Sequence, residues 1–301
     1  MELRHLRYFV AVAEAGSLTL AAEKRLHTSQ PSLSRQIRDL EYEVGVQLMS
    51  RSVHGIELTA AGRAFLDHAR LALTQAEAAT EAARRAAQPS KPIFSMGFLT
   101  GQEVDWLPHA PGILREELPD LEIRVSSGFS TNLADDLQRG KLDVAFLRPE
   151  PKPDLDYKLV RKEPLVVILP SDHPLAGNQA IAAQDLSEKT FIGISDVAPV
   201  LRAAVKAFLR RSGVEIVPTL EIDNYAMAMS LVIATRGLAL LPASIEGYLP
   251  WSIASRPLAG ARPTVDLVVG YHKANTSPIL KKFLAGIDEL SARIYGKARA
   301  A

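Results

Sequence analysis

Residues 18–48 constrain the fold of this chain most, because they have the pattern of two helices joined by a tight turn. In the second helix, apolar residues recur every three or four positions, which predicts one buried stripe on an amphipathic helix. The stripe consists of Leu33, Ile37, Leu40 and Val44. The first helix has a short apolar face, which consists of Leu18, Ala21, Ala22 and Leu26. The pattern predicts a helix-turn-helix that inserts its second helix into a DNA major groove. The alternative is an ordinary helical hairpin with a solvated basic face.

The outward face of the second helix favours the DNA-binding interpretation. Thr28 or Ser29 can cap the free amides, and Pro31 fits the first helical turn. The net charge of the 301-residue chain is only +1, yet four basic residues between positions 24 and 38 are not interrupted by an acid. These residues are Lys24, Arg25, Arg35 and Arg38. The charge expected to face DNA is therefore local.

The candidate DNA-binding residues are Thr28, Ser29, Gln30, Pro31, Ser32, Ser34, Arg35, Arg38 and Arg51. Base edges carry the sequence information of DNA, and phosphate contacts hold a protein in register. We expect base-edge contacts from Gln30, Ser34 and Arg35. We expect backbone contacts from Thr28, Ser32, Arg38 and Arg51. Arg51 is in residues 48–58, which predict a small β-hairpin, or wing, beside the second helix.

Two further helices are expected in the N-terminal region. Residues 3–15 predict an amphipathic helix, and residues 59–87 predict one long helix that Thr59 can cap. At 1.5 Å per residue the long helix would extend roughly 40 Å, more than one small domain can bury. Its thin apolar seam consists of Phe65, Ala69, Leu73, Ala76 and Ala83. The seam predicts a helix that pairs with its copy in a dimer, and the alternative is a spacer helix.

From residue 93 the pattern changes to short strands that alternate with helices, which predicts a parallel α/β sheet. The expected strands are 93–99, 121–126, 142–147, 165–169, 191–194, 216–222, 238–241 and 264–271. The expected helices are 104–117, 131–139, 200–211, 225–235 and 277–295. A chain of this length predicts two or three domains.

Several function classes are excluded by residue types that are missing. The sequence has no cysteine, its seven histidines lack metal-ligand spacing, and it has neither a nucleophile elbow nor a phosphate-binding loop. We therefore expect no enzyme activity, no catalytic residues, no metal and no cofactor. Arg4, His5, Arg7 and Glu14 interrupt the apolar positions that a signal peptide would need, and no apolar run approaches eighteen residues. A cytoplasmic protein without a membrane partner is expected.

The stretch MELRHLRYFVAVAEAGSLTLAAEKRLHTSQPSLSRQIRDLE resembles the N-terminus of the LysR-type transcriptional regulators. The similarity continues over essentially the full length. Three segments resemble the branch that activates operons for breakdown of aromatic acids, arylalkanoates and benzoate. They are GFLTGQEVDWLP (Gly97–Pro108), EPLVVILPSDHPLA (Glu163–Ala176) and RPLAG (Arg256–Gly260).

The resemblance implies an α/β chain with an N-terminal winged helix-turn-helix, a long linker helix and a two-lobed effector domain like periplasmic solute-binding proteins. The implied ranges are 1–58 for DNA binding, 59–88 for the linker and dimerisation helix, and 93–301 for the effector domain. Lobe I would comprise 93–162 and 266–301, and lobe II 163–265. The implied partners are double-stranded operator DNA, a small carboxylate effector and further copies of the chain, as homodimer or homotetramer. RNA polymerase stays open as a partner. The alternative is a transporter's solute-binding protein without a DNA role.

Ligands of α/β folds collect at the carboxyl ends of strands and at helix N-termini, where free amides bind anions. Small hydroxyl or glycine residues stand at three such places, and Arg148 ends a strand where it can bind a carboxylate as a fork. Each feature alone is also typical of a simple N-cap. Their joint placement matches the effector contacts of the aromatic-acid branch. The candidate effector-binding residues are Thr100, Gly101, Ser130, Thr131, Arg148 and Ser195.

Three residues depart from the family pattern. Gly101 replaces a serine found in several aromatic-acid regulators, so Thr100 or backbone amides would hold a carboxylate instead. Thr235 and Arg236 stand where the family commonly has a glycine and a small or apolar residue. We expect Arg236 to alter the wall of lobe II. The effector is expected to be a small aromatic or dicarboxylic acid.

Overall fold

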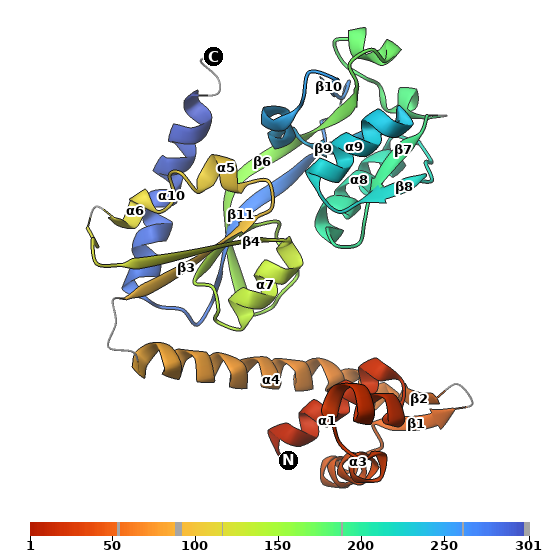
Figure 1. Ribbon diagram of the computed structural model, residues 1–301, viewed down its shortest axis with the longest axis vertical. Coiled ribbons are helices and arrows are strands. Elements are labelled where there is room, and N and C mark those ends of the chain that lie inside the picture. Colours follow the sequence, from red (N-terminus) through yellow and green to blue (C-terminus); the bar gives the residue numbers. More distant parts are fainter. Residues whose placement is uncertain (53–54, 88–91, 116, 188, 261, 298–301) are drawn as a thin grey trace. The chain divides into compact units, whose positions relative to one another are not determined.

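The computed structural model describes residues 1–301 except 53–54, 88–91, 116, 188, 261 and 298–301 (Figure 1). A few further side chains lie outside the description, namely those of Arg25, Arg51, Ser52, Ala82, 85–87 and 295–297. The chain forms two compact units, Met1–Ala87 and Gln88–Ala301. Among the helices described, none is both long and apolar enough to cross a membrane.

The first unit is mainly helical. Its elements are α1 (Leu3–Ala15), α2 (Leu18–Leu20), the π-helical turn η1 (Ala21–Leu26), α3 (Gln30–Val44), β1 (Met49–Ser52), β2 (Gly55–Leu58) and α4 (Ala60–Ala87). Strands β1 and β2 are antiparallel, so the expected hairpin is present. The turn before α3 is closed by His27, which has a left-handed backbone conformation with φ of 47°. Residues 18–48 thus form the helix-turn-helix that their apolar pattern predicts.

The core of the first unit contains the apolar stripe of α3. Leu33, Ile37 and Leu40 are buried there, and α3 packs against α1, α2 and η1. Phe9 of α1 is fully buried and meets Phe65 of α4 edge to face, with ring centroids 5.1 Å apart. Burying apolar side chains from several helices is what stabilises a unit of this size.

The start of α4 is capped as expected, because the Gly62 amide donates to Thr59 Oγ1 at 2.9 Å. The apolar seam of α4 was predicted to pair with its copy in a dimer, but more than half of it is covered within its own unit. Phe65, Ala69 and Leu73 pack into the core of their own unit, since α1 lies against this half of the helix. Within the predicted seam, half-buried Ala76 and exposed Ala83 remain to contact another chain.

The second unit is a mixed α/β domain. Its first part contains β3 (Ile93–Leu99), α5 (Glu103–Trp106), α6 (Gly112–Arg115), β4 (Glu122–Gly128), α7 (Ser130–Gln138), β5 (Val144–Leu147) and β6 (Leu155–Pro170). Next come η2 (Pro174–Gly177), η3 (Ala183–Leu186), β7 (Phe191–Ile194), α8 (Pro199–Arg211), β8 (Leu220–Ile222), α9 (Tyr225–Thr235) and β9 (Leu238–Pro242). The last part contains η4 (Ala243–Tyr248), β10 (Ile253–Pro257), β11 (Thr264–His272) and α10 (Pro278–Lys297).

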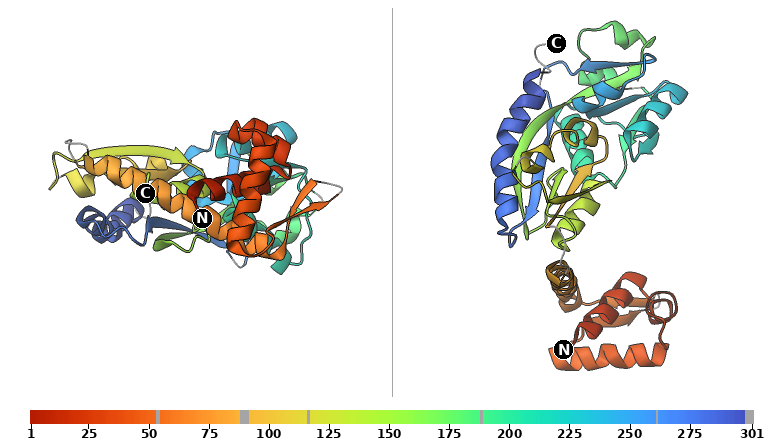
Figure 2. Two further views of the ribbon diagram at one scale, coloured as in Figure 1. Left: turned by 90° about the horizontal axis from the view of Figure 1, so that it is seen from below. Right: turned by 60° about the vertical axis from the view of Figure 1, so that its left-hand side comes forward.

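The strands of this unit follow the order β4-β3-β5-β11-β6-β9-β7-β8, and β10 also pairs with β6. The outer strands β4, β3 and β5 are mutually parallel, and so are β8, β7 and β9. The central strands β6 and β11 pair antiparallel with each other and with their neighbours. The predicted parallel pairing is therefore present in each half and is replaced by antiparallel pairing at the centre, where two long strands connect the two halves (Figure 2).

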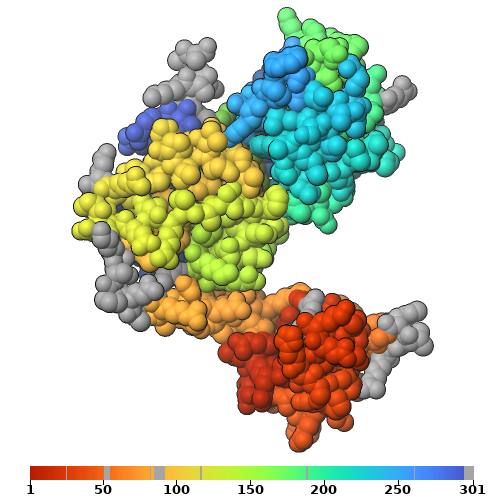
Figure 3. Space-filling view, in the orientation of Figure 1, coloured from red at the N-terminus to blue at the C-terminus, as the bar shows by residue number. Residues whose placement is uncertain are grey.

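Two lobes result from this connection. One lobe carries α5, α6 and α10 around a core that includes Phe98, Trp106 and Phe146, and α7 packs on a second, smaller core. The other carries α8 and α9 around a core of aliphatic residues from β6, β7 and β9. In Figure 3 the lobe with α7 (yellow-green) and the lobe with α8 and α9 (cyan) are seen as two bodies that touch. The lobe limits at 162/163 and 265/266 stay predictions.

Three details of the predicted elements are corrected. The strand expected at 165–169 begins ten residues earlier, at Leu155, because the chain runs through both lobes without a turn. The helix expected at 104–117 is two short helices, α5 and α6, since Pro108 and Pro111 lie between them and cannot donate backbone hydrogen bonds. Strand β10 was not predicted, and it adds an edge to the second half of β6.

Candidate functional site

The outward face of α3 carries most of the candidate DNA-binding residues. Ser29 is the N-cap, where its Oγ accepts a hydrogen bond from the Ser32 amide at 3.4 Å, and Pro31 lies in the first turn. The side chain of Arg35 is 77% exposed and its Nε is 4.0 Å from Asp39 Oδ2. An exposed pair at that distance contributes little, so the guanidinium is available to another partner. Arg38 is also exposed.

The remaining candidates lie close to this face. Pro31 and Ser32 are exposed, whereas Thr28, Gln30 and Ser34 are half-buried. The backbone of Arg51 lies in β1 opposite Ile56, but its side chain is outside the described part of the chain. The structure thus gathers hydroxyl, amide and guanidinium groups on one helix face. No acidic residue lies between Arg35 and Arg38 in the sequence.

A cleft lies between the two lobes of the second unit. Thr100, Ser130 and Arg148 line it from the first lobe. Ala198, Asn224 and Tyr225 line it from the second lobe. Most of the other lining residues are apolar, and the cleft encloses ≈ 60 Å³. A cavity that holds benzene measures about 150 Å³. The enclosed space is therefore smaller than an aromatic ring fills.

Three helices begin at the cleft. Helix α7 follows Phe129 and α8 follows Ala198, and neither of these N-cap residues supplies a side-chain hydrogen bond. Helix α9 is capped by Asn224, whose Oδ1 accepts from the Met227 amide at 2.9 Å. The first amides of an uncapped helix lack partners and carry partial positive charge. The starts of α7 and α8 are consequently suited to bind an anion.

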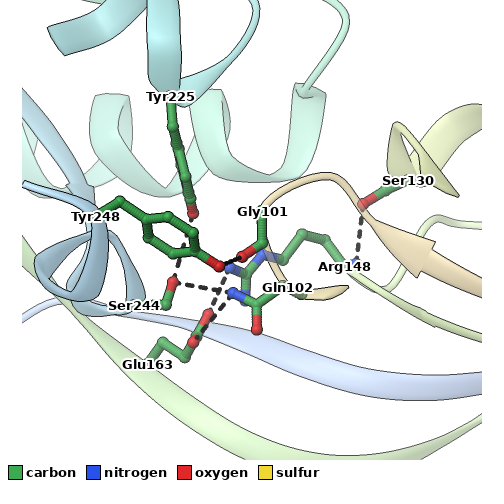
Figure 4. Close-up of polar contacts among 8 residues, drawn as sticks. All are labelled: Gly101, Gln102, Ser130, Arg148, Glu163, Tyr225, Ser244 and Tyr248. Atoms are coloured by element: carbon green, nitrogen blue, oxygen red, sulfur yellow. Dashed lines mark hydrogen bonds and ion pairs between the residues drawn. The ribbon is translucent and has the colours of Figure 1, made fainter. Parts of the chain in front are cut away.

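Arg148 is held in this region by two neighbours (Figure 4). Its backbone amide donates to Ser130 Oγ at 2.9 Å. Its Nη2 lies 2.5 Å from Glu163 Oε2, and both side chains are almost fully buried. The Tyr225 hydroxyl, which also lines the cleft, hydrogen-bonds to the same guanidinium. The guanidinium is therefore charge-paired but still has N–H groups to offer a ligand.

The loop after β3 is held against the other lobe by a polar network, which Figure 4 draws. Gln102 is fully buried, and its Nε2 donates to Ser244 Oγ at 2.9 Å and lies 3.4 Å from Glu163 Oε1. The Tyr248 hydroxyl donates to the Gly101 carbonyl oxygen. These contacts connect the cleft to Glu163 on the long strand β6. None of Gln102, Glu163 and Ser244 was predicted from sequence.

Gly101 makes the closest approach between the lobes. Its φ is +93°, and a Cβ atom there would lie 2.8 Å from Cδ2 and Cε2 of Tyr225. Only glycine adopts this backbone conformation without strain. A side chain at this position would meet an aromatic ring that also lines the cleft. Gly101 therefore contacts the second lobe directly, and it is not among the residues that line the cleft.

Burial changes the titration of several groups near the cleft. Burial raises the pKa of Tyr225, and the Glu163 carboxylate adds to this effect while Arg148 opposes it. Burial, followed by the Asp105 and Glu103 carboxylates, raises the pKa of Tyr248 to about 12. Both tyrosines thus stay neutral at physiological pH and keep their O–H donors.

The other sequence candidates have separate positions. Thr131 is half-buried and its Oγ1 lies 3.3 Å from Asn132 Oδ1, and Ser195 is buried with its amide bonded to the Ile222 carbonyl. Neither is among the residues that line the cleft. The Ser195 hydroxyl has no partner among the described residues. The structure therefore brings Thr100, Ser130 and Arg148 together and leaves Thr131 and Ser195 beside them.

The expected effect of Arg236 on the wall of lobe II is corrected. Arg236 ends α9 with a left-handed φ of 54°, and its guanidinium contacts both Asp172 carboxylate oxygens at 3.1 Å. The two side chains are largely exposed. Thr235 is bonded within α9, since its Oγ1 donates to the Leu231 carbonyl at 2.7 Å. Neither residue lines the cleft.

Among the residues that the structure describes, no group of three or more His, Cys, Asp or Glu side chains could hold a metal ion. The two regions offer an exposed basic helix face in one unit and, in the other, a cleft that contains Arg148 and the starts of two uncapped helices.

Comparisons with known proteins match both regions. Residues 3–63 match the family of bacterial regulatory helix-turn-helix proteins, lysR family, and residues 87–291 match the LysR substrate binding domain. The chain is 40% identical to the Hca operon transcriptional activator HcaR of Escherichia coli (strain K12), over 98% of this chain and 99% of that protein.

Solved structures agree with this assignment. Full-length BenM is 28% identical with a TM-score of 0.59, covering 99% of this chain and 98% of that chain. Full-length CbnR complexed with its target DNA is 29% identical with a TM-score of 0.56, covering 97% and 100%. The helix-turn-helix match argues against the alternative of a transporter's solute-binding protein. The chain belongs to the LysR family of bacterial transcriptional regulators, which combines a DNA-binding unit with a ligand-responsive domain.

Proposed function

We propose that this regulator binds operator DNA through α3 and responds to a small aromatic carboxylate that binds between the two lobes. The observation that carries the ligand assignment is the convergence of the uncapped starts of α7 and α8 on a cleft that also contains Arg148. Amides, partial positive charge and a guanidinium are the groups that bind a carboxylate. The apolar lining residues favour an aromatic body.

The DNA role is assigned to individual groups. Gln30, Ser34 and Arg35 contact base edges. The phosphate backbone is held by Thr28, Ser32, Arg38 and Arg51. Support comes from the exposure of Arg35 and Arg38 on one helix face and from the similarity to CbnR in complex with its target DNA. Regulators with this motif commonly read paired half-sites as dimers, so we propose that the chain acts as a homodimer or homotetramer.

Binding of a ligand in the cleft changes the conformation of the second unit. Because ≈ 60 Å³ is too small for an aromatic ring, a bound ligand changes the spacing between the lobes. The contacts of Gly101 and Gln102 with the second lobe break or shift when that spacing changes. This change of lobe geometry is the signal that the regulator transmits. We further propose that the protein acts in the cytoplasm and does not convert its ligand, so product analysis should find the ligand intact.

A thermal-unfolding screen of the full-length protein against aromatic acids tests the ligand assignment. A ligand at about one hundred times its dissociation constant stabilises the folded state by roughly 2.7 kcal/mol, which moves the midpoint visibly. The matched variant is Arg148→Lys, which keeps a positive charge beside Glu163 but cannot form a fork. We expect the variant to fold and to lose most of the ligand-induced shift. A shift of equal size in Arg148→Lys would place the carboxylate elsewhere.

A further inference from the structure

One acidic side chain in the cleft has no role in binding a carboxylate. Glu150 lines the cleft two residues after Arg148 and is 5% exposed. Its Oε1 is buried and has no hydrogen-bond partner among the residues that the structure describes. A buried carboxyl group without a partner is unfavourable, so such groups are normally hydrogen-bonded.

The neighbours of Glu150 are occupied by other contacts. The nearby ammonium of Lys152 pairs with Asp135 Oδ1 at 2.7 Å. The Tyr157 hydroxyl donates to the backbone carbonyl of Glu150 at 2.7 Å, not to its carboxyl group. Burial raises the pKa of Glu150, Lys152 opposes this and Asp135 adds to it. These neighbours therefore leave the buried Oε1 without a partner, and Glu150 lines the cleft.

The charges of the cleft limit what that partner is. Among the described residues that line the cleft, the charged side chains are Arg148, Glu150 and Asp223. Arg148 is already neutralised by Glu163 at 2.5 Å. A ligand with a carboxylate at each end would put one of them beside an acid without a compensating base. Repulsion of like charges in a low-dielectric site makes this unfavourable.

We propose that Glu150 determines ligand specificity, and that the cleft takes an aromatic monocarboxylate with a hydrogen-bond donor, hydroxyl or amino, placed away from its carboxylate. The donor bonds to Glu150, and the carboxylate binds at the starts of α7 and α8 with Arg148. This inference rests on the proposed function. It excludes the dicarboxylic acids that the sequence left open.

Isothermal titration of the full-length protein with matched acids tests the proposal. The probes are benzoate, its three hydroxy, three amino and three methoxy derivatives, the corresponding phenylacetates, and phthalate as a dicarboxylate. A methyl ether keeps the oxygen but removes the donor. We expect one hydroxy or amino isomer to bind at least about tenfold more tightly than the unsubstituted acid, because a site built for a donor rejects analogues that lack one. We expect no gain from methoxy groups and no binding of phthalate.

Variants connect this preference to Glu150. Glu150→Met has a similar length but no carboxyl, and should bind substituted and unsubstituted acids equally. Glu150→Gln keeps an acceptor oxygen and should retain part of the preference. Glu122→Gln changes an exposed acid outside the cleft and should retain all of it. The ligand-free unfolding midpoint of each variant reports whether it is folded.

The outcomes separate the two proposals. Equal binding of hydroxy, amino, methoxy and plain acids by the wild-type protein would overturn the role of Glu150 while the carboxylate site stands. A preference that persists in Glu150→Met, or tighter binding of phthalate, would do the same. The methoxy comparison needs no variant, so it decides the matter even if Glu150→Met does not fold. If no acid binds at all, the carboxylate site itself is wrong, and this inference is overturned with it.

Discussion

The helix face of α3 and the cleft of the second unit use the same side-chain type in opposite ways. Arg35 is exposed and has only a weak contact with Asp39, whereas Arg148 is buried and paired with Glu163. An exposed guanidinium meets a phosphate or base edge without first breaking an internal contact. A buried one is already partnered, so a ligand that uses it must rearrange its neighbours. The first arrangement suits recognition of DNA, and the second couples binding to a change of conformation.

The largest effect is expected when the buried pair of the cleft is broken. Glu163→Leu leaves the Arg148 charge buried without its carboxylate, which should cost about 3–5 kcal/mol of unfolding free energy. Urea unfolding of the full-length protein measures this loss. The double variant Arg148→Met/Glu163→Leu removes both charges and should recover most of it. As a surface control, Glu122→Ala breaks the exposed contact with Arg124 and should cost no more than about 1 kcal/mol. A double variant as unstable as the single one would contradict the charge explanation.

Adding a single methyl group at the contact between the lobes should lower the stability of the protein. Gly101→Ala places a Cβ atom 2.8 Å from the Tyr225 ring on a backbone with φ of +93°, so we expect a loss of roughly 1–3 kcal/mol. Gly112→Ala is the control, because nothing lies within 4 Å of its Cβ position. Thermal unfolding of the two variants checks the difference. Equal midpoints would show that the lobes accommodate a side chain at position 101 without cost.

On the DNA side, two exposed arginines should lose affinity in different ways. Arg35→Ala removes a base contact and should reduce the preference for operator over random DNA by about 1–3 kcal/mol. Arg38→Ala removes a phosphate contact and should weaken binding to both DNAs equally, with a salt dependence smaller by about one charge. Fluorescence anisotropy at several salt concentrations measures both. Equal losses of Arg35→Ala on operator and random DNA would refute the base-reading role.

The smallest effect is expected at the exposed pair of Arg236 and Asp172. A hydrogen bond from Arg236 lowers the pKa of Asp172 below its ordinary value of 3.8. A carboxyl group with a lowered folded-state pKa stabilises the protein above the ordinary value, and the contribution is lost as the pH falls through the lowered one. Arg236→Gly should return the Asp172 pKa toward 3.8 and leave the midpoint at pH 7 nearly unchanged, because glycine accepts the left-handed conformation. NMR titration of Asp172 checks the shift, and an unchanged pKa would contradict the cause given.

The sequence predicted the first unit well because its determinants are local. The stripe of Leu33, Ile37 and Leu40, the cap at Ser29 and the proline at 31 each act within one helix. The α4 seam was harder to predict, since a heptad-like pattern does not say whether α1 or another chain covers Phe65 and Ala69.

The cleft was predicted by its place in the fold and only partly by its residues. Thr100, Ser130 and Arg148 stand at strand ends or helix starts, where a short-range pattern finds them. Glu163 and Ser244 are 61 and 142 positions from Gln102, which contacts both. No local pattern connects residues that far apart. A glutamine directly after the predicted ligand loop, in a segment of small residues, is the one signal that could have suggested a buried polar contact.

The continuity of β6 has a thermodynamic consequence. Its 16 residues form part of the sheets of both lobes, because the strand pairs with β11 in its first half and with β9 and β10 in its second. Neither lobe can lose its sheet without withdrawing a strand from the other. We therefore expect the two lobes to melt in one cooperative transition, so that a ligand touching only a few side chains of the cleft raises the melting temperature of both together.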